Sequence, residues 1–178
     1  PKRVNNTMFR PRYGYNARTG WRTPLQPSEE EEILGPEKLS QNVVTGTDYL
    51  GTTTGFTSNR GGVLSSSTDE AHSGERSLKV VTPGTQTLEG IVISAIPVLT
   101  ATPYKMGLWA LAPADSIISL RVCSPNCQEH LFTGTGDWEP VSFVSTSQEQ
   151  CTSSIYIRTK NMEAITFYLD DFSFKEVL

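Results

Sequence analysis

The chain has 178 residues, which is enough for one ordinary domain with an appendage. Hydrophobic residues make up 37% and charged residues 19%, whereas Ser and Thr reach about a fifth and favour short strands joined by loops. The longest apolar stretch, 90–101, contains Pro97 and is too short to cross a bilayer, and no signal-peptide pattern is seen, so we expect no membrane partner.

The formal net charge of −4 hides a strong asymmetry along the chain. Residues 1–28 contain basic side chains and no acidic one, whereas four consecutive glutamates follow at 29–32. Acidic residues then outnumber basic ones from Lys38 onward. The sequence therefore predicts a basic arm, a short acidic segment and a mildly acidic body.

The arm, residues 1–37, lacks any sustained helical or strand period, and its prolines interrupt regular structure. It is nevertheless rich in arginine and aromatic residues, which anchor protein interfaces. We expect the arm to be extended, mostly irregular and ordered against a partner, with these binding residues: Arg3, Phe9, Arg10, Arg12, Tyr13, Tyr15, Arg18, Trp21 and Arg22. A solvated tail and a nucleic-acid-binding arm are the alternatives, and the acidic body argues against nucleic acid.

The acidic segment allows two interpretations. Ser28 could cap one or two helical turns that carry Glu29–Glu32 near the positive end of the helix dipole and stop at Gly35-Pro36. The alternative is a charged spacer without regular structure.

From residue 38 onward the sequence consists of short runs separated by turn residues. No helical segment separates these runs, so they predict an all-β domain over 38–178, an antiparallel jelly-roll β-sandwich. The expected strands are Gly62–Ser67, Ser77–Thr82, Gly90–Ala95, Tyr104–Ala112, Ser116–Cys123, His130–Thr133, Glu139–Ser145, Ser153–Thr159 and Ile165–Lys175.

Alternation of residue type supports two of these strands. In 153–159, Ile155 and Ile157 face one side and Tyr156 and Arg158 face the other. In 139–145 the same alternation places Val141 and Phe143 on one side.

Four phrases of the body resemble one known family. The segment 67–80 resembles the "D-x-x-H-S-G-x-x-S-L-K-V" phrase of carbohydrate-binding-module-like jelly rolls, and 104–112 resembles their "Y-x-x-S-x-W-V-K-A" strand. The segment 135–142 is similar to "T-G-T-W-x-x-V-S", and 166–174 is similar to "F-Y-V-D-D-V-x-L". The four phrases occur in the expected order and cover most of residues 50–178.

The resemblance implies two settings for such a domain. Some members are appended to polysaccharide-degrading enzymes and bind glycans, and others are structural parts of tailed-phage virions. It also implies that Trp109 and Trp138 occupy core positions. Asp170 and Asp171 would either accept hydrogen bonds from a loop or help to bind Ca²⁺. We expect no cofactor, with Ca²⁺ at these two residues as the alternative.

The cysteines and histidines offer little chemistry. Cys123, Cys127 and Cys151 could form a zinc site with His130, or the first two could form a disulfide, but ordinary thiols are the preferred interpretation. Neither His130 nor His72 is placed beside a nucleophile by any motif, so we expect no enzyme activity.

These observations predict a non-enzymatic phage virion component, made in the host cytoplasm and located on the virion surface. The arm would fasten a capsid decoration or minor capsid protein to the major capsid protein or another virion protein, with a homo-oligomer as a further expectation. The first alternative is a tail or baseplate protein that contacts host surface glycans. The second is the carbohydrate-binding module of a secreted glycan-degrading enzyme.

Overall fold

The computed structural model describes residues 13–15, 22–24, 32–40, 43 and 52–178. The chain divides into two compact units, 1–33 and 34–178. In the first unit, strand β1 (Tyr13–Tyr15) pairs antiparallel with β2 (Arg22–Pro24). This short ladder lies within the arm that the sequence predicts to be mostly irregular.

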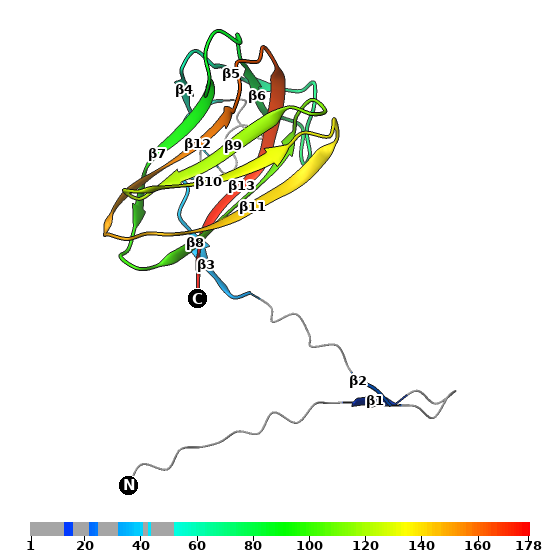
Figure 1. Ribbon diagram of the computed structural model, residues 1–178, viewed down its shortest axis with the longest axis vertical. Helices are drawn as coiled ribbons and strands as arrows, with labels where there is room; N and C mark the ends of the chain where they lie inside the picture. The colour runs from blue at the N-terminus through cyan, green and yellow to red at the C-terminus, as the bar shows by residue number, and fades with distance from the viewer. Residues whose placement is uncertain (1–12, 16–21, 25–31, 41–42, 44–51) are drawn as a thin grey trace. The chain divides into compact units, whose positions relative to one another are not determined.

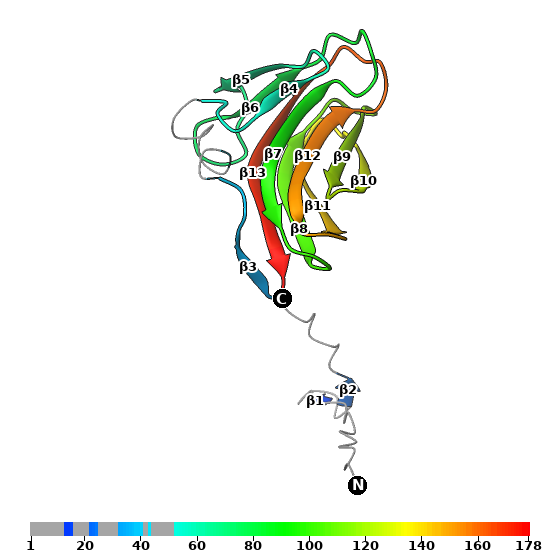
Figure 2. The same ribbon diagram turned by 90° about the vertical axis from the view of Figure 1, so that its left-hand side faces the viewer.

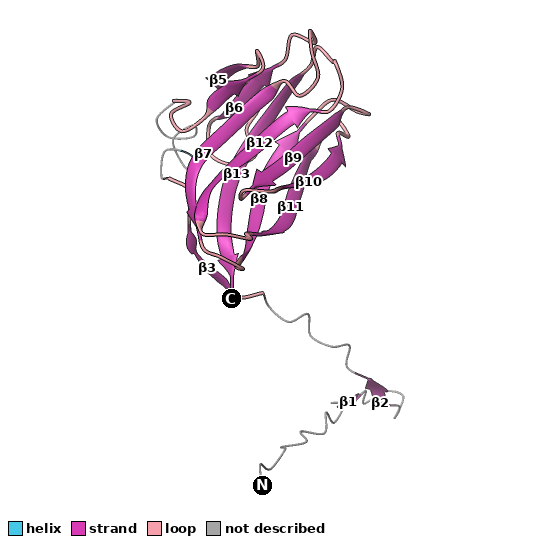
Figure 3. Ribbon diagram, turned by 60° about the vertical axis from the view of Figure 1, so that its left-hand side comes forward, coloured by secondary structure: helices cyan, strands magenta, loops and turns pink. Residues whose placement is uncertain are grey.

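The second unit is a sandwich of two antiparallel sheets (Figures 1 and 3). The five-stranded sheet has the order β10-β9-β12-β7-β4, with bounds β4 (Thr57–Asn59), β7 (Gly90–Val98), β9 (Ile117–Cys123), β10 (Cys127–Thr133) and β12 (Cys151–Thr159). The other sheet has the order β11-β8-β13-β6-β5, with bounds β5 (Val63–Ser67), β6 (Ser77–Val81), β8 (Pro103–Leu111), β11 (Trp138–Thr146) and β13 (Thr166–Val177). The all-β sandwich predicted from the sequence is confirmed, and each of the nine expected strands is present.

The core lies between the two sheets because alternate residues of each strand point inward. In β12, Ile155 and Ile157 are fully buried, as the alternation predicts. In β8 the buried positions are Tyr104, Met106, Leu108 and Ala110. The remaining core comes from both sheets and includes Leu78, Val80, Ile91, Ile93, Ile118, Leu120, Phe167, Leu169 and Phe174.

A strand occupies the place where the sequence suggested the end of a helical turn. Strand β3 (Leu34–Glu37) pairs antiparallel with the last part of β13 (Figure 2). The Glu37 carboxylate accepts hydrogen bonds from the backbone N–H groups of Leu39 and Phe174, at 3.0 and 2.7 Å. A helix that includes Leu34 is therefore wrong, because backbone pairing with β13 outweighs the local signal, while residues 28–31 lie outside the described residues.

A buried carboxylate fixes the loop between β6 and β7. Glu89 is fully buried, and its carboxylate accepts hydrogen bonds from the backbone N–H groups of Gly84, Thr85 and Gln86 and from the Thr85 hydroxyl, at 2.7–3.0 Å. Burial alone would raise the pKa of Glu89, but these donors together lower the pKa below its ordinary value. The charged form of Glu89 therefore holds this loop.

Within the described residues, no helix has the length and apolar character needed to span a membrane.

Candidate functional site

Most of the predicted arm residues cannot be placed. Arg3, Phe9, Arg10, Arg12, Arg18 and Trp21 lie outside the described residues, whereas Tyr13 and Tyr15 belong to β1 and Arg22 to β2. Docking of the arm on a partner therefore stays a prediction.

Asp170 and Asp171 lie at an irregularity in β13, where the pairing with β8 shifts register between Asp170 and Ser173. The Asp170 side chain is 4% exposed and accepts hydrogen bonds from the backbone N–H groups of His72, Ser73 and Asp171, at 3.0, 3.1 and 2.9 Å. Burial raises the pKa of Asp170, and the three backbone donors oppose that shift. Asp170 therefore fastens the loop that precedes β6 to the sheet.

The surroundings of the two carboxylates do not fit a Ca²⁺ site. Asp171 binds the imidazole Nδ1 of His72 and the hydroxyl of Ser73, each at 2.6 Å, so donors engage both carboxylates. Calcium requires six to eight oxygen ligands, whereas N–H and O–H donors converge here. No cluster of three or more metal-ligating side chains occurs among the described residues.

Ser73, His72 and Asp171 are the residue types of a hydrolytic triad, but they are not arranged as one. The hydroxyl of Ser73 donates to the Asp171 carboxylate, and His72 Nδ1 binds that same carboxylate. In a nucleophilic triad the histidine lies between the serine and the acid and removes the serine proton. This arrangement is a loop clamp.

The two tryptophans of the body are not core residues, contrary to the expectation from the family resemblance. Trp109 alternates with the buried Leu108 and Ala110, so it points to the opposite face of β8 and is half-buried. His72 stacks on its ring at a centroid distance of 3.7 Å, and Trp138 approaches the edge of His72 at 5.8 Å. Because His72 covers one face of Trp109, that face is closed to a stacked sugar.

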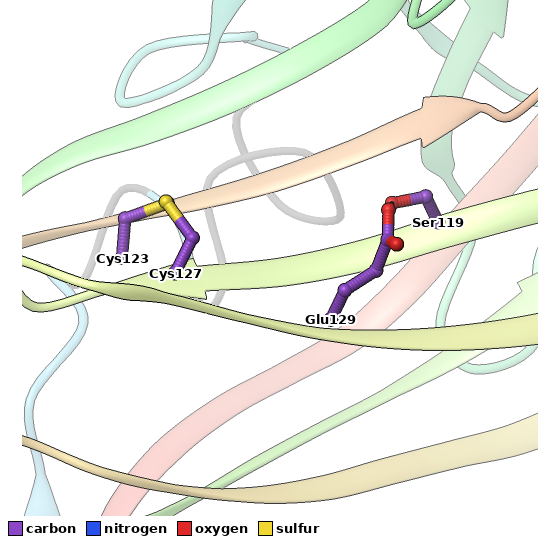
Figure 4. Close-up of a disulfide and its surroundings, with 4 residues drawn as sticks. All are labelled: Ser119, Cys123, Cys127 and Glu129. Atoms are coloured by element: carbon purple, nitrogen blue, oxygen red, sulfur yellow. A yellow bond between two sulfur atoms is a disulfide. The ribbon is translucent and has the colours of Figure 1, made fainter.

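Two of the three cysteines form a disulfide, whereas the sequence favours ordinary thiols. Cys123 and Cys127 are opposite each other at the end of the β9–β10 pair and are bonded, whereas Cys151 is free (Figure 4). Bonded sulfurs are not thiolate ligands, so a zinc site built on these two cysteines is wrong.

The face of the five-stranded sheet that points away from the core has an ordered set of polar side chains. Strand pairing places two rows of side chains across the sheet, because directly opposed residues share a face. The first row is Glu129, Arg121, Tyr156, Val92 and Thr57, and the second row is Leu131, Ser119, Arg158, Gly90 and Asn59. We call these two rows, together with the adjacent Lys160, the polar face.

A carboxylate organises one end of the polar face (Figure 4). Glu129 accepts a hydrogen bond from the hydroxyl of the fully buried Ser119 at 2.7 Å and forms an ion pair with the ammonium of Lys160 at 2.9 Å. The hydrogen bonds from Ser119 and Lys160 lower the pKa of Glu129. Glu129 is therefore a fixed anion at neutral pH.

A buried guanidinium lies at the centre of the polar face. Arg158 is 6% exposed, and its guanidinium carbon lies 4.7 Å from the centre of the Tyr156 ring. Its Nε and Nη2 atoms are buried and have no hydrogen-bond partner among the residues that the structure describes. The same is true of Arg121 Nε and Asn59 Oδ1. Burial, with the nearby charges of Arg121 and Arg60, lowers the pKa of Arg158.

Such an arrangement is suited to binding a polar ligand. Unpaired buried donors are costly, so native structures retain few of them without a functional or structural reason. Here the guanidinium groups of two arginines, an amide and a tyrosine ring lie on the outward face of one sheet, where Arg121, Tyr156 and Asn59 are partly exposed. Groups of these kinds can contact a ligand that presents both oxygens and an apolar ring face.

The polar face could have been found only in part from the sequence. Alternation in 153–159 already places Tyr156 and Arg158 together on one side. Arg121 lies in another predicted strand, and its meeting with Tyr156 depends on the pairing of β9 with β12. A single charged residue within a predicted strand, such as Arg121, does not by itself indicate a binding site.

No protein-family model matches the sequence, and no curated protein matches it. Solved structures do match the fold. The CBM22-1 xylan-binding domain of Xyn10C from Paenibacillus barcinonensis has a TM-score of 0.62 at 16% identity, over 74% of this chain and 90% of that domain. TmCBM61, solved in complex with β-1,4-galactotriose, has a TM-score of 0.60 at 18% identity, over 79% of this chain and 98% of that protein.

A phage protein shows the same fold. The enzymatically active domain of tailspike protein 4 from bacteriophage CBA120 has a TM-score of 0.59 at 10% identity, over 79% of this chain but only 21% of the tailspike domain. The sandwich therefore has the jelly-roll fold of carbohydrate-binding modules, which also occurs within a phage tailspike. At these identities the likeness establishes the fold alone.

Proposed function

We propose that the sandwich is a non-catalytic glycan-binding module and that the polar face is its binding surface. The observation that carries this proposal is the buried guanidinium of Arg158, which has unpaired donors and contacts the ring of Tyr156. Sugars offer hydroxyl oxygens to such donors and apolar ring faces to aromatic side chains, so one ligand can satisfy both.

Two of the similar structures support this proposal through their ligands. One is described as a xylan-binding domain and the other was solved with a galactotriose. A third structure of this fold, a family 22 module from Clostridium thermocellum Xyn10B, was studied for the role of amino acids in its cleft in ligand binding. These structures thus support the interpretation as a glycan-binding module better than the interpretation as a purely structural virion protein.

The test is a binding measurement with the full chain on an array of plant, bacterial and algal glycans, followed by calorimetry on the best ligand. Replacing Tyr156 with Ala is expected to weaken binding at least about tenfold, because the ring contact and the packing of Arg158 are both lost. The matched control is Tyr168→Ala, since Tyr168 lies in β13 of the other sheet and also has a cation, Lys79, over its ring at 5.6 Å. Equal losses in the two variants, or no glycan binding by the parent chain, would refute the proposal.

A virion location is the second candidate function, favoured by the basic arm. Residues 1–28 have basic and no acidic side chains, and the fold occurs within a phage tailspike. In this proposal the arm binds the major capsid protein or another virion protein and the sandwich is displayed on the virion surface as a capsid decoration or minor capsid protein, as a monomer or a homo-oligomer. A tail or baseplate location would place the same polar face against host glycans.

Cosedimentation with purified virions of the source phage tests the arm. The full chain is expected to cosediment, and a variant with the arm arginines Arg10, Arg12, Arg18 and Arg22 changed to Gln is expected to remain in solution. Undiminished cosedimentation of that variant would contradict the role of the arm, without bearing on glycan binding.

A further inference from the structure

Charge is distributed unequally between the two sheets. Among the residues that form β4, β7, β9, β10 and β12, Glu129 is the one acidic side chain, and Arg121 and Arg158 are basic. Lys160 lies directly after β12 and Arg60 directly after β4, and both act on the polar face. The strands of the other sheet contain five acidic side chains, Glu37, Glu139, Asp170, Asp171 and Glu176, and three basic ones, Lys79, Lys105 and Lys175, so acidic residues predominate there. The polar face is thus a cationic surface on a chain whose net charge is −4.

The one acidic side chain of the polar face acts on the buried arginine through its charge but makes no hydrogen bond to it. The Glu129 carboxylate is engaged by Lys160 and by the Ser119 hydroxyl. Arg158 Nε and Nη2 and Arg121 Nε retain unpaired N–H groups. Buried charges are normally paired, because an isolated charge is expensive to remove from water. No carboxylate among the described residues accepts a hydrogen bond from these N–H groups of Arg158 and Arg121.

We propose that the polar face binds an acidic polysaccharide, with a carboxylate or sulfate group held by the guanidinium groups of Arg158 and Arg121. This inference rests on the proposed glycan-binding function and narrows it to a ligand class. Guanidinium groups bind oxyanions through directed, charge-assisted hydrogen bonds, which are stronger than neutral ones.

The neighbouring groups fit the sugar ring that bears such an anion. Asn59 follows Gly90 and Arg158 along the second row of the polar face and is partly exposed, so its side-chain amide can contact a sugar hydroxyl. Tyr156 lies opposite Arg121 and offers a ring surface. A uronic acid or a sulfated sugar presents an anion, hydroxyl donors and an apolar ring face within one residue.

A nucleic acid fits this surface less well. Binding of single strands relies on a track of cations along many phosphates and on several aromatic side chains that stack successive bases. Tyr156 is the one aromatic side chain in the two rows of the polar face. The cations gather around one buried guanidinium, which favours a single anionic group.

The experiment compares four polymers on the full chain by affinity electrophoresis and calorimetry, at low and at high salt. Polygalacturonate supplies carboxylates, dextran sulfate supplies sulfates, β-1,4-galactan is neutral, and single-stranded DNA supplies phosphates. We expect at least one of the two acidic polysaccharides to bind about tenfold or more tightly than galactan and DNA, with weaker binding at high salt. The acidic polymer that binds more tightly identifies the anion.

Variants then locate the site. Arg158→Met keeps the apolar stem and removes the guanidinium, and it is expected to weaken binding of the acidic polymer about ten- to hundredfold. Arg158→Lys keeps the charge and is expected to restore part of the affinity. Arg76→Met, just before β6 in the other sheet, is the matched control and should bind like the parent. Arg121→Met gives an independent test if Arg158→Met fails to fold, which circular dichroism reports.

The outcomes separate the inference from the proposed function. Galactan binding as tight as that of the acidic polymers, or full affinity in both Arg158→Met and Arg121→Met, would overturn the acidic ligand and leave glycan binding in place. DNA binding as tight as acidic polysaccharide binding would overturn it in favour of a general polyanion site. If neither these polymers nor the array glycans bind, the proposed function falls together with the inference.

Discussion

Replacing Asp170 with Asn tests the loop clamp on the sheet that contains β13. Asp170 Oδ2 accepts hydrogen bonds from the backbone N–H groups of His72 and Ser73, and Oδ1 accepts one from Asp171. The amide of Asn has a single acceptor oxygen, so it can keep the first two bonds while its NH₂ group faces the N–H of Asp171. One buried donor then loses its partner, which costs about 1–3 kcal/mol of the free energy of unfolding.

Asp170→Ala extends the same series. It removes all three acceptor contacts, so we expect a loss of about 3–5 kcal/mol, near the upper end for single substitutions and a large share of the stability of a small domain. The matched control is Asp171→Asn, because Asp171 is next along the chain, its side chain is 36% exposed, and its carboxylate binds the side chains of His72 and Ser73. An exposed pair of this kind contributes within about 1 kcal/mol.

Urea unfolding followed by circular dichroism measures these differences, and each variant should retain glycan binding because the clamp lies on the other sheet. The reasoning is refuted if Asp170→Asn and Asp171→Asn are equally stable within about 0.5 kcal/mol, which is the scatter of ordinary surface substitutions.

Two further predictions concern stability. The pKa of Glu89 is lower in the folded protein than in the unfolded chain, so the unfolded chain binds more protons, and the stability that this group contributes is lost as the pH falls below 4.5 through the folded pKa. Glu89→Gln should therefore be less stable than the parent at pH 7, and its melting temperature should fall less steeply on acidification. A melting temperature that falls equally steeply in both proteins would contradict this role of Glu89. Replacing Cys123 and Cys127 with Ser should lower the free energy of unfolding by about 2 kcal/mol in urea titrations, because the disulfide closes a loop with a sequence separation of 4; the absence of any change would show that it does not constrain the unfolded chain.

The sequence predicts the strands well because each one has a local signal. Alternation in 153–159 and 139–145 specifies which residues face the core, and both patterns hold in the structure. The sequence does not predict strands β3 and β4, because they are only four and three residues long. They are strands because they pair with β13 and β7, which lie far away in the sequence.

The environment of Trp109 and the composition of the polar face could not be predicted from local sequence patterns. Trp109 has the size of a core residue, but Leu108 and Ala110 occupy the inward positions of β8, and the distant His72 covers the outward ring. The polar face joins Arg121 and Arg158, which are far apart in the sequence and meet only through the pairing of β9 with β12. Such a site follows from topology, which composition and periodicity do not determine.

The measurement that bears most directly on the central claim is a titration of the isotopically labelled full chain with its best glycan, followed by backbone amide chemical shifts in nuclear magnetic resonance spectra. We expect the largest shifts in β9 and β12, around Arg121, Tyr156 and Arg158. Largest shifts around His72 and Trp109 on the other sheet would contradict it, because they would place the glycan on the surface that the loop clamp closes.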